Sequence, residues 1–343
     1  MPGTQRQTTL RFLAAPMEGN QKGRVEGGTV LAWIDKAGYA EAVAWSGRYC
    51  VTAYVGNVRF KRPVQVGELV EVHAHMVHTG RSSMHIVCTV SSGDPSTGEL
   101  EITCQCLMIF VATDGEGSSV EVPRFEPEDG WEREQQQTAI RRIEGRKAIE
   151  QDMAEHVYTD ATEAHQQTLR FLAKPSDVNW GGKVHGGIVM EWIDQAANLV
   201  AETWHEGRAI AVFAGGVRFY RPIQIGHLVQ VEARLIHTGH SSMHVSVHVS
   251  SGDPMAGEME LTTHCLMVLV ALDESGTRKR AVRSWNPRLD EDLALQAHAK
   301  RLIDILGAGP GGSPHGAQLP VLMVPPAGFP TPGFPAAGFR RAS

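Results

Sequence analysis

The sequence of 343 residues has no long apolar run and no excess of basic residues. No stretch approaches the roughly 20 apolar residues that a helix needs to cross a bilayer. The formal net charge is −6, whereas proteins that bind nucleic acid usually present a basic face. The first ten residues lack the apolar stretch of a signal peptide. These absences predict a cytoplasmic protein with no membrane and no nucleic-acid partner.

Cysteine is also scarce, at five residues. Cys88, Cys104 and Cys106 share the inward phase of apolar strands, which favours buried thiols over disulfides. Cys104 and Cys106 are separated by one residue and lack the two-residue spacer and second ligand pair of a zinc site. The sequence therefore predicts no metal, and no motif in it calls for a cofactor.

The sequence does contain a long internal repeat. Residues 10–114 return at 169–273 with a constant shift of 159 and no gap, and 53 of the 105 aligned residues are identical. A period of this length is that of a domain, since solenoid repeats have periods of roughly 20–50 residues. We therefore expect two copies of one fold unit, each with its own core.

Each copy combines one helical segment with several strands. From Gly27 onward, Val30, Ile34 and Ala37 recur at helical spacing, and the second copy repeats the pattern from Gly186. Later segments alternate apolar and polar side chains, and the turn sequences at 91–95 and 250–254 predict an antiparallel hairpin between the last two strands. The pattern predicts an α+β fold with one long helix packed on an antiparallel sheet.

Composition divides the chain into five parts. We expect a first domain at 1–115, a linker with a helix at 116–165, a second domain at 166–274, a helical segment at 275–306 and a tail at 307–343. The linker helix is expected over 131–154, where Glu, Gln, Arg and Ala predominate. The tail is rich in Pro, Gly and Ala and too poor in aliphatic residues to form a core, so it is predicted to be disordered.

One motif occurs in both copies and combines an Asn, two consecutive glycines and an Asp. The first copy has Asn20, Gly27, Gly28 and Asp35, and the second has Asn179, Gly186, Gly187 and Asp194. The seven residues between the second glycine and the Asp make about two helical turns, so both face the same side. An isolated Asp is usually solvated, but its repetition at a fixed distance from the glycines favours catalysis. The asparagines are candidates for a functional role or for simple turn residues.

These motifs, together with segments 58–63, 66–70 and 79–84, resemble the hotdog-fold acyl-CoA thioesterases. Two copies in one chain resemble the double-hotdog acyl-CoA hydrolases. The resemblance implies tandem hotdog domains whose sheets continue one another and whose long helices lie side by side. It also implies hydrolysis of acyl-CoA to a fatty acid and CoA without a cofactor, and a homotrimer of two-domain chains.

The same resemblance implies sites shared between the copies. It pairs Asn20 with Asp194, and Asn179 with Asp35. The amides at Gly27-Gly28 and Gly186-Gly187 would polarise the thioester carbonyl and stabilise its developing charge, because they begin a helix. The Asp would act as a base or a nucleophile.

The two copies differ at one position of the motif. Glu26 stands where the second copy has His185, the residue common in the family. A carboxylate there could compete with the substrate oxygen for the same amides, so this difference casts doubt on whichever site lies beside Glu26.

Shared cations and hydroxyls are candidates for binding the CoA nucleotide, because Arg forms bidentate contacts with phosphate and hydroxyls donate to it. The alternative is that the arginines are solvated charges at strand edges. The candidates are Arg59, Arg62, Arg81, Ser82, Ser83, Arg218, Arg221, Ser241 and Ser242.

Two other functions fit the same fold. A hotdog dehydratase or hydratase would act on the acyl chain, but such enzymes typically pair an acid with a histidine, and the first copy lacks His before its glycines. A non-catalytic acyl-CoA-sensing module would keep the pocket without the acid. Both copies keep the acid, so the sequence favours a thioesterase.

Overall fold

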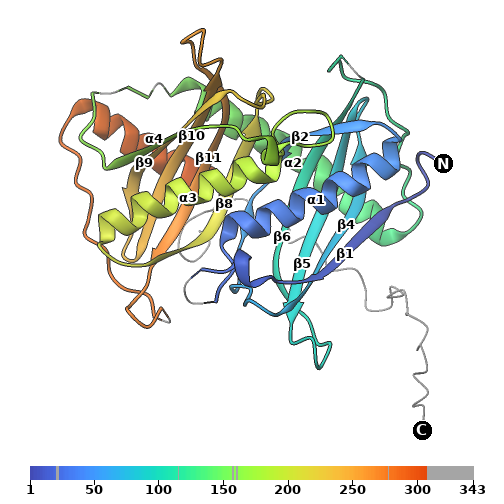
Figure 1. The fold of residues 1–343 in the computed structure, drawn as a ribbon, viewed down its shortest axis with the longest axis horizontal. Helices are drawn as coiled ribbons and strands as arrows, with labels where there is room; N and C mark the ends of the chain where they lie inside the picture. Colours follow the sequence, from blue (N-terminus) through green and yellow to red (C-terminus); the bar gives the residue numbers. More distant parts are fainter. Residues whose placement is uncertain (21–22, 115, 157, 160, 277, 307–343) are drawn as a thin grey trace.

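The computed structural model describes residues 1–20, 23–114, 116–156, 158–159, 161–276 and 278–306. They form two similar units, each with a long helix packed on antiparallel strands (Figure 1). This α+β arrangement is the one predicted. The tail predicted to be disordered lies outside the described residues.

The first unit begins with an edge strand and a helix. Its elements are β1 (Gln7–Leu13), the short helix η1 (Pro16–Glu18), α1 (Gly27–Ser46), β2 (Tyr49–Val55), β3 (Val58–Arg59), β4 (Leu69–Thr79), β5 (Ser83–Gly93) and β6 (Glu101–Thr113). Helix α1 starts at the predicted glycine and ends at Gly47, whose φ of 63° closes it with a left-handed turn.

The second unit repeats this order. Its elements are β7 (Gln166–Leu172), η2 (Pro175–Asp177), α3 (Gly186–His205), β8 (Ala209–Phe219), β9 (Leu228–Thr238), β10 (Ser242–Gly252) and β11 (Glu260–Ala271). β5 pairs with β6 and β10 pairs with β11 in antiparallel register, which confirms both predicted hairpins.

The two units share one continuous sheet. The strand order is β1-β4-β5-β6-β2-β8-β11-β10-β9-β7, with β3 also paired to β8. β2 and β8 join the units through the antiparallel pairs Tyr54–Arg218 and Val55–Val217. The sheets thus continue one another, as the resemblance implies, and β1 and β7 are the two free edges.

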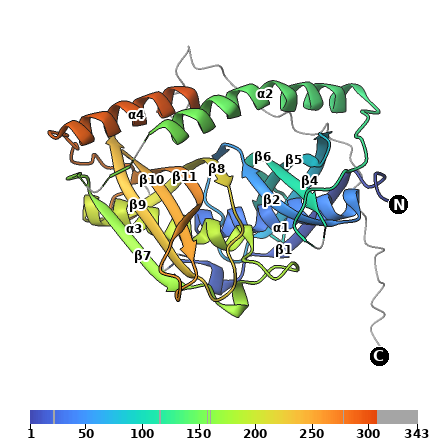
Figure 2. The same cartoon turned by 90° about the horizontal axis from the view of Figure 1, so that it is seen from above.

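Four long helices cover the two faces of this sheet. α1 and α3 lie on one face, while α2 (Gly130–Glu155) and α4 (Asp290–Leu306) lie on the other (Figure 2). α2 confirms the predicted linker helix, and its Ala139 packs in a small cluster with Val77, Val87 and Leu107. Because its second face is covered as well, β5 is buried along most of its length rather than at alternate residues.

The core contains the predicted apolar residues. Val70, Val72, Ala74 and Met76 are fully buried, as their alternation predicts. All five cysteines are free and buried, which confirms the prediction of buried thiols. Among the described residues no helix is both long and apolar enough to cross a bilayer.

Candidate active site

Helices α1 and α3 meet at their N-terminal ends, where they run antiparallel and very close together. A Cβ on Gly28 would lie 2.8 Å from the Cα of Glu191, and a Cβ on Gly187 would lie 2.8 Å from the Cα of Ala32. Real Cβ atoms are not found at such distances from backbone. The second glycine of each motif is therefore required for the two helices to approach.

This approach brings Asp35 to the start of α3. The Gly187 amide donates a hydrogen bond of 2.9 Å to Oδ2 of Asp35, and the Thr52 hydroxyl donates one of 2.6 Å to Oδ1. Nδ1 of His185 lies 3.0 Å from Oδ2. Asp35 is buried, so these contacts and the dipole of α3 replace the water that its carboxylate loses.

Asp194 occupies the equivalent place at the start of α1 but has fewer partners. The Gly28 amide donates to its carboxylate, while Oδ1 is buried without a hydrogen-bond partner among the described residues. The pKa of Asp194 is raised to about 7, mainly by burial and also by the charges of Glu26 and Glu191, while the hydrogen bonds from Gly28 and Asn198 act in the opposite direction.

The difference between the two carboxylates comes from two substitutions between the copies. Thr52 corresponds to Ala211, which has no hydroxyl to offer Asp194, and His185 corresponds to Glu26. The charge of Glu26 acts on Asp194, so the site in doubt from the sequence is the Asp194 site. The chain thus contains two carboxylate sites with different surroundings.

The asparagines of the motif lie in the loops before the helices. Oδ1 of Asn179 accepts hydrogen bonds from the amides of Gly181 at 2.9 Å and Lys183 at 3.1 Å. Oδ1 of Asn20 accepts one from Arg24 at 3.3 Å. The asparagines therefore stabilise their own turns, whatever further role they have.

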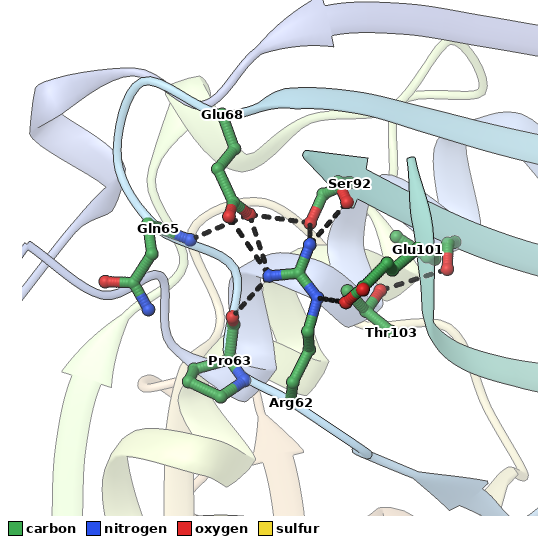
Figure 3. A network of polar contacts seen from close by, with 8 residues as sticks. Arg62, Pro63, Gln65, Glu68, Ser92, Glu101 and Thr103 are labelled. Carbon is green, nitrogen blue, oxygen red and sulfur yellow. Dashed lines mark hydrogen bonds and ion pairs between the residues drawn. The ribbon is translucent and has the colours of Figure 1, made fainter. Parts of the chain in front are cut away.

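Arg62, predicted for CoA, is held inside the protein (Figure 3). Its guanidinium lies 3.0 Å from Glu68 Oε1 and 2.9 Å from Ser92 Oγ, and 3.4 Å from Glu101 Oε2. Glu68 and Ser92 are also hydrogen-bonded to each other at 2.7 Å. This network fixes the loop after β3 to the end of β5, so Arg62 has a structural role.

The other predicted CoA residues are dispersed. Arg59 stacks over Phe213 and Arg218 over Tyr220. Arg221 pairs with Glu260 in the second copy's version of the Arg62 position. Arg81, Ser82, Ser83, Ser241 and Ser242 belong to the β4–β5 and β9–β10 turns, where the carbonyls of Ser83 and Ser242 close the turns. The structure does not gather these side chains into one site.

Two cavities adjoin the start of α1 and differ in charge. The first, which we call the acidic cavity, has a volume of about 360 Å³. Its charged lining residues are Glu18, Glu26, Glu191, Asp194 and Lys36. The second, the basic cavity, has a volume of about 410 Å³ and an otherwise largely apolar wall. Its charged lining residues are Arg24, Lys61, Arg62 and Lys279.

Several of these residues could not be identified from the sequence pattern. Thr52 lies on β2, 17 residues after Asp35, and no helical or strand period connects the two. Lys61 and Lys279 come from different units and have no cationic counterpart in the other copy. The change from Thr52 to Ala211 did not stand out in the sequence, because residues 49–55 and 208–214 differ at every aligned position.

Comparison with known proteins adds the family. The model of the thioesterase superfamily matches residues 22–99 and 181–258, once in each copy. The chain is 26% identical over 263 residues to the cytosolic acyl coenzyme A thioester hydrolase of Mus musculus, covering 72% of this chain and 68% of that protein. It is 31% identical over 121 residues to the acyl-CoA thioester hydrolase YciA of Salmonella typhimurium, covering 34% of this chain and 90% of the relative.

A solved structure supports the arrangement of the two units. It is a protein of Lactobacillus plantarum, provisionally assigned as an oleoyl thioesterase. It matches with a TM-score of 0.56 at 11% identity, over 80% of this chain and all of that one. At this identity the likeness shows the tandem hotdog fold alone.

Proposed function

This chain belongs to the thioesterase superfamily, and from that premise we propose that it hydrolyses acyl-CoA to a free fatty acid and CoA at two composite sites. Each site takes its carboxylate from one copy and its helix N-terminus from the other. The contact between Asp35 and the Gly187 amide carries this proposal, because it places an acidic group from one copy at the helix start of the other. Asp194 and Gly28 repeat it in reverse.

The arrangement supports a simple reaction. The Asp takes a proton from water, whose oxygen attacks the thioester carbonyl, or the Asp attacks the carbonyl itself and forms an anhydride that water then hydrolyses to the free acid and Asp. The C–S bond then breaks, and the departing CoA thiolate takes up a proton. The first amide of each helix, at Gly27 and Gly186, has no carbonyl partner within its own helix and is free to stabilise the oxyanion.

The Asp35 site has the more complete surroundings for this reaction. Thr52 and the Gly187 amide hold both carboxylate oxygens, so the side chain keeps one orientation. Asp194 has hydrogen bonds from Gly28 and Asn198, but its Oδ1 has no partner among the described residues, and it is buried beside Glu26. We propose that Asp35 carries most of the activity at neutral pH, with Asn179 orienting the water or carbonyl, and that Asp194 with Asn20 carries less.

Thiol release tests this function. The wild-type chain, Asp35→Asn, Asp194→Asn and the double variant are assayed with acyl-CoAs of several chain lengths. We expect the larger loss from Asp35→Asn and no activity in the double variant. Full activity in the double variant would contradict the proposal.

The pairing of His185 with Asp35 is the one observation that favours the hydratase alternative, since such enzymes combine an acid with a histidine. The histidine side chain also accepts a hydrogen bond from the Gly187 amide at 3.1 Å and so caps α3. The alternatives give different products. A hydratase would add water to an enoyl-CoA without releasing thiol. A sensing module would bind acyl-CoA without altering the acyl chain or releasing thiol.

Assembly and location complete the proposal. We propose a homotrimer, as the resemblance implies, and the sheet edges are suitable contacts, since β1 and β7 end in the exposed residues Leu13 and Leu172. Light scattering should give three times the chain mass of 37.3 kDa, and a monomer mass would refute the trimer. The mammalian relatives are named cytosolic, which supports a cytoplasmic location.

A further inference from the structure

The basic cavity lies between the two units, beside the start of α1. Its lining comes from the segment before α1, the segment after β3, strand β8 and the segment after β11. Its volume of about 410 Å³ is within the range of small-molecule sites, roughly 300–1,000 Å³. The cavity is therefore large enough to enclose part of an extended ligand.

The charged groups of this cavity are all cationic. Arg24 donates a hydrogen bond of 2.7 Å to the Gly276 carbonyl, which ties the two units together at the rim. Lys61 and Lys279 are exposed, and their ammonium groups have no ion-pair partner in the part of the chain that the structure describes. Because Arg62 forms an ion pair with Glu68, the cations left to attract an anionic ligand are Arg24, Lys61 and Lys279.

Asp194 does not line this cavity but lies directly beside its wall at Gly27. A Cβ on Gly27 would lie 3.3 Å from both Asp194 Oδ1 and the Cβ of Ala211, and Gly27 and Ala211 both line the cavity. Oδ1 is the buried oxygen without a partner. The cavity thus combines a cationic rim and apolar side chains with the start of α1 at Gly27, and an unpartnered carboxylate oxygen lies next to Gly27.

On its other side Asp194 lines the acidic cavity, whose negative charges repel an anion. The acidic cavity brings Glu18, Glu26 and Glu191 against Asp194, and Lys36 is the only cation among the described residues that line it. Burial and neighbouring carboxylates raise the pKa of Glu191, as expected where negative charges crowd together. An anionic ligand would therefore enter from the basic side.

We propose that Arg24, Lys61 and Lys279 bind the phosphates of an acyl-CoA whose thioester lies at Asp194. The inference rests on the proposed function for the identity of the ligand. Lysine and arginine form strong charge-assisted hydrogen bonds with phosphate, while the apolar wall suits the uncharged arm that connects phosphate to thioester.

The cationic rim is stronger at the Asp194 site, since only one of its three cations has a cationic counterpart in the other copy. The counterparts of Arg24, Lys61 and Lys279 in the other copy are Lys183, Tyr220 and Val120. The Tyr220 hydroxyl is bonded to His264 at 2.9 Å, and Lys183 Nζ to Gln224 at 2.5 Å. The Asp194 site, which lacks the threonine hydroxyl, therefore attracts phosphate more strongly. The Asp35 site has fewer cations but holds its carboxylate with more hydrogen bonds.

Binding of CoA itself tests this, because the product binds without turnover. Calorimetric titration compares the wild-type chain with Lys61→Glu, Lys279→Glu and the double variant, each with CoA and with pantetheine, which lacks the phosphates. Each substitution should weaken CoA binding about tenfold or more, as expected for losing a hydrogen bond to a charged group. Pantetheine affinity should change less than about twofold.

Lys147→Glu on α2 is the matched control, since it makes the same charge change at an exposed lysine on the other face of the sheet. Thermal melts confirm folding. Equal weakening by the control, an unchanged CoA affinity in the double variant, or no CoA binding by the wild-type chain would each overturn the inference. Lysine-dependent CoA binding without thiol release would preserve it and reject the proposed hydrolysis instead.

A kinetic arm assigns the cavity to one site. In the Asp35→Asn background, the two lysine substitutions should raise KM about tenfold or more with little change in kcat. In the Asp194→Asn background they should leave KM within about twofold. The opposite pattern would place the phosphates at the Asp35 site and overturn the assignment.

Discussion

Asp35 accepts a hydrogen bond of 2.9 Å from the amide of Gly187, a residue 152 positions further along the chain. The contact crosses from one copy of the repeat to the other. Neither copy contains both the carboxylate and the helix start of a site, so the folded pair is the smallest unit that can hold one.

Gly187→Ala tests how closely the helices must approach. The new Cβ would lie 2.8 Å from the Cα of Ala32, so α1 and α3 would have to separate. We expect activity at the Asp35 site to fall at least about 100-fold and stability by roughly 1–3 kcal/mol. Gly130→Ala is the control, because no atom lies within 4 Å of its added Cβ. Wild-type activity in Gly187→Ala would contradict the need for close approach.

Thr52→Ala tests whether the hydroxyl orients Asp35. In the Asp194→Asn background it removes the 2.6 Å hydrogen bond to Oδ1 and should lower kcat roughly 10- to 100-fold. Thr52→Ser keeps the hydroxyl and should restore most of the rate. If Ala and Ser behave alike, the hydroxyl has no part in positioning the carboxylate.

The pH dependence of the Asp194 site follows from its raised pKa of about 7. A catalytic base must be deprotonated, so activity of Asp35→Asn should rise with pH, with a midpoint near 7. Adding Ala211→Thr gives the charged form a hydrogen-bond donor and should move the midpoint to lower pH. If the rise in activity with pH were unchanged in an Asp194→Asn variant, the titrating group would not be Asp194.

Glu41 offers a test of stability. It is fully buried on α1, and burial raises its pKa to about 7 despite a hydrogen bond from Thr8. Because the folded-state pKa lies above the ordinary value of 4.5, the contribution of this group to stability is complete below that value and is lost as pH rises through about 7. Its counterpart in the second copy is Val200.

Glu41→Val should therefore raise the free energy of unfolding at pH 8 by roughly 1–3 kcal/mol, with a smaller effect at pH 5. Denaturant unfolding at both pH values measures this. Glu41→Gln is the control, because it removes the charge while keeping the size. A variant less stable than wild type at pH 8 would show that the carboxylate is compensated.

Arg62→Gln separates structure from ligand binding. Its guanidinium is held by Glu68 and Ser92, so the change should lower stability by roughly 1–3 kcal/mol and leave CoA affinity nearly unchanged. Thermal unfolding and CoA titration measure the two effects. A loss of affinity without a loss of stability would return Arg62 to the CoA site.

The sequence was sufficient for the fold. Apolar alternation along β4 and helical spacing after Gly27 identified the elements, because each buries an apolar face in the core between α1 and the sheet. The repeat showed that there are two units, and the resemblance implied that their sheets pair. Alternation also predicted the strand β5, but its polar residues His85 and Thr89 are buried as well, because α2 covers the second face of the sheet.

The sequence was less informative about the site. Asp35 and the glycines share one helix, so their spacing is visible in the motif. Thr52 and His185 reach Asp35 only through tertiary packing, from β2 and from the other copy. The lysines of the basic cavity meet across the boundary between the units, where no local pattern connects them.

The antiparallel pairing of β2 with β8 joins the sheets of the two non-identical copies into one sheet. In an assembly of two identical chains, every substitution would alter both centres at once. Covalent fusion removes that constraint: Ala211 can lose a hydroxyl that Thr52 keeps, and Lys61 can bear a charge that Tyr220 lacks. The surroundings of the two carboxylates in this molecule can therefore change independently of one another.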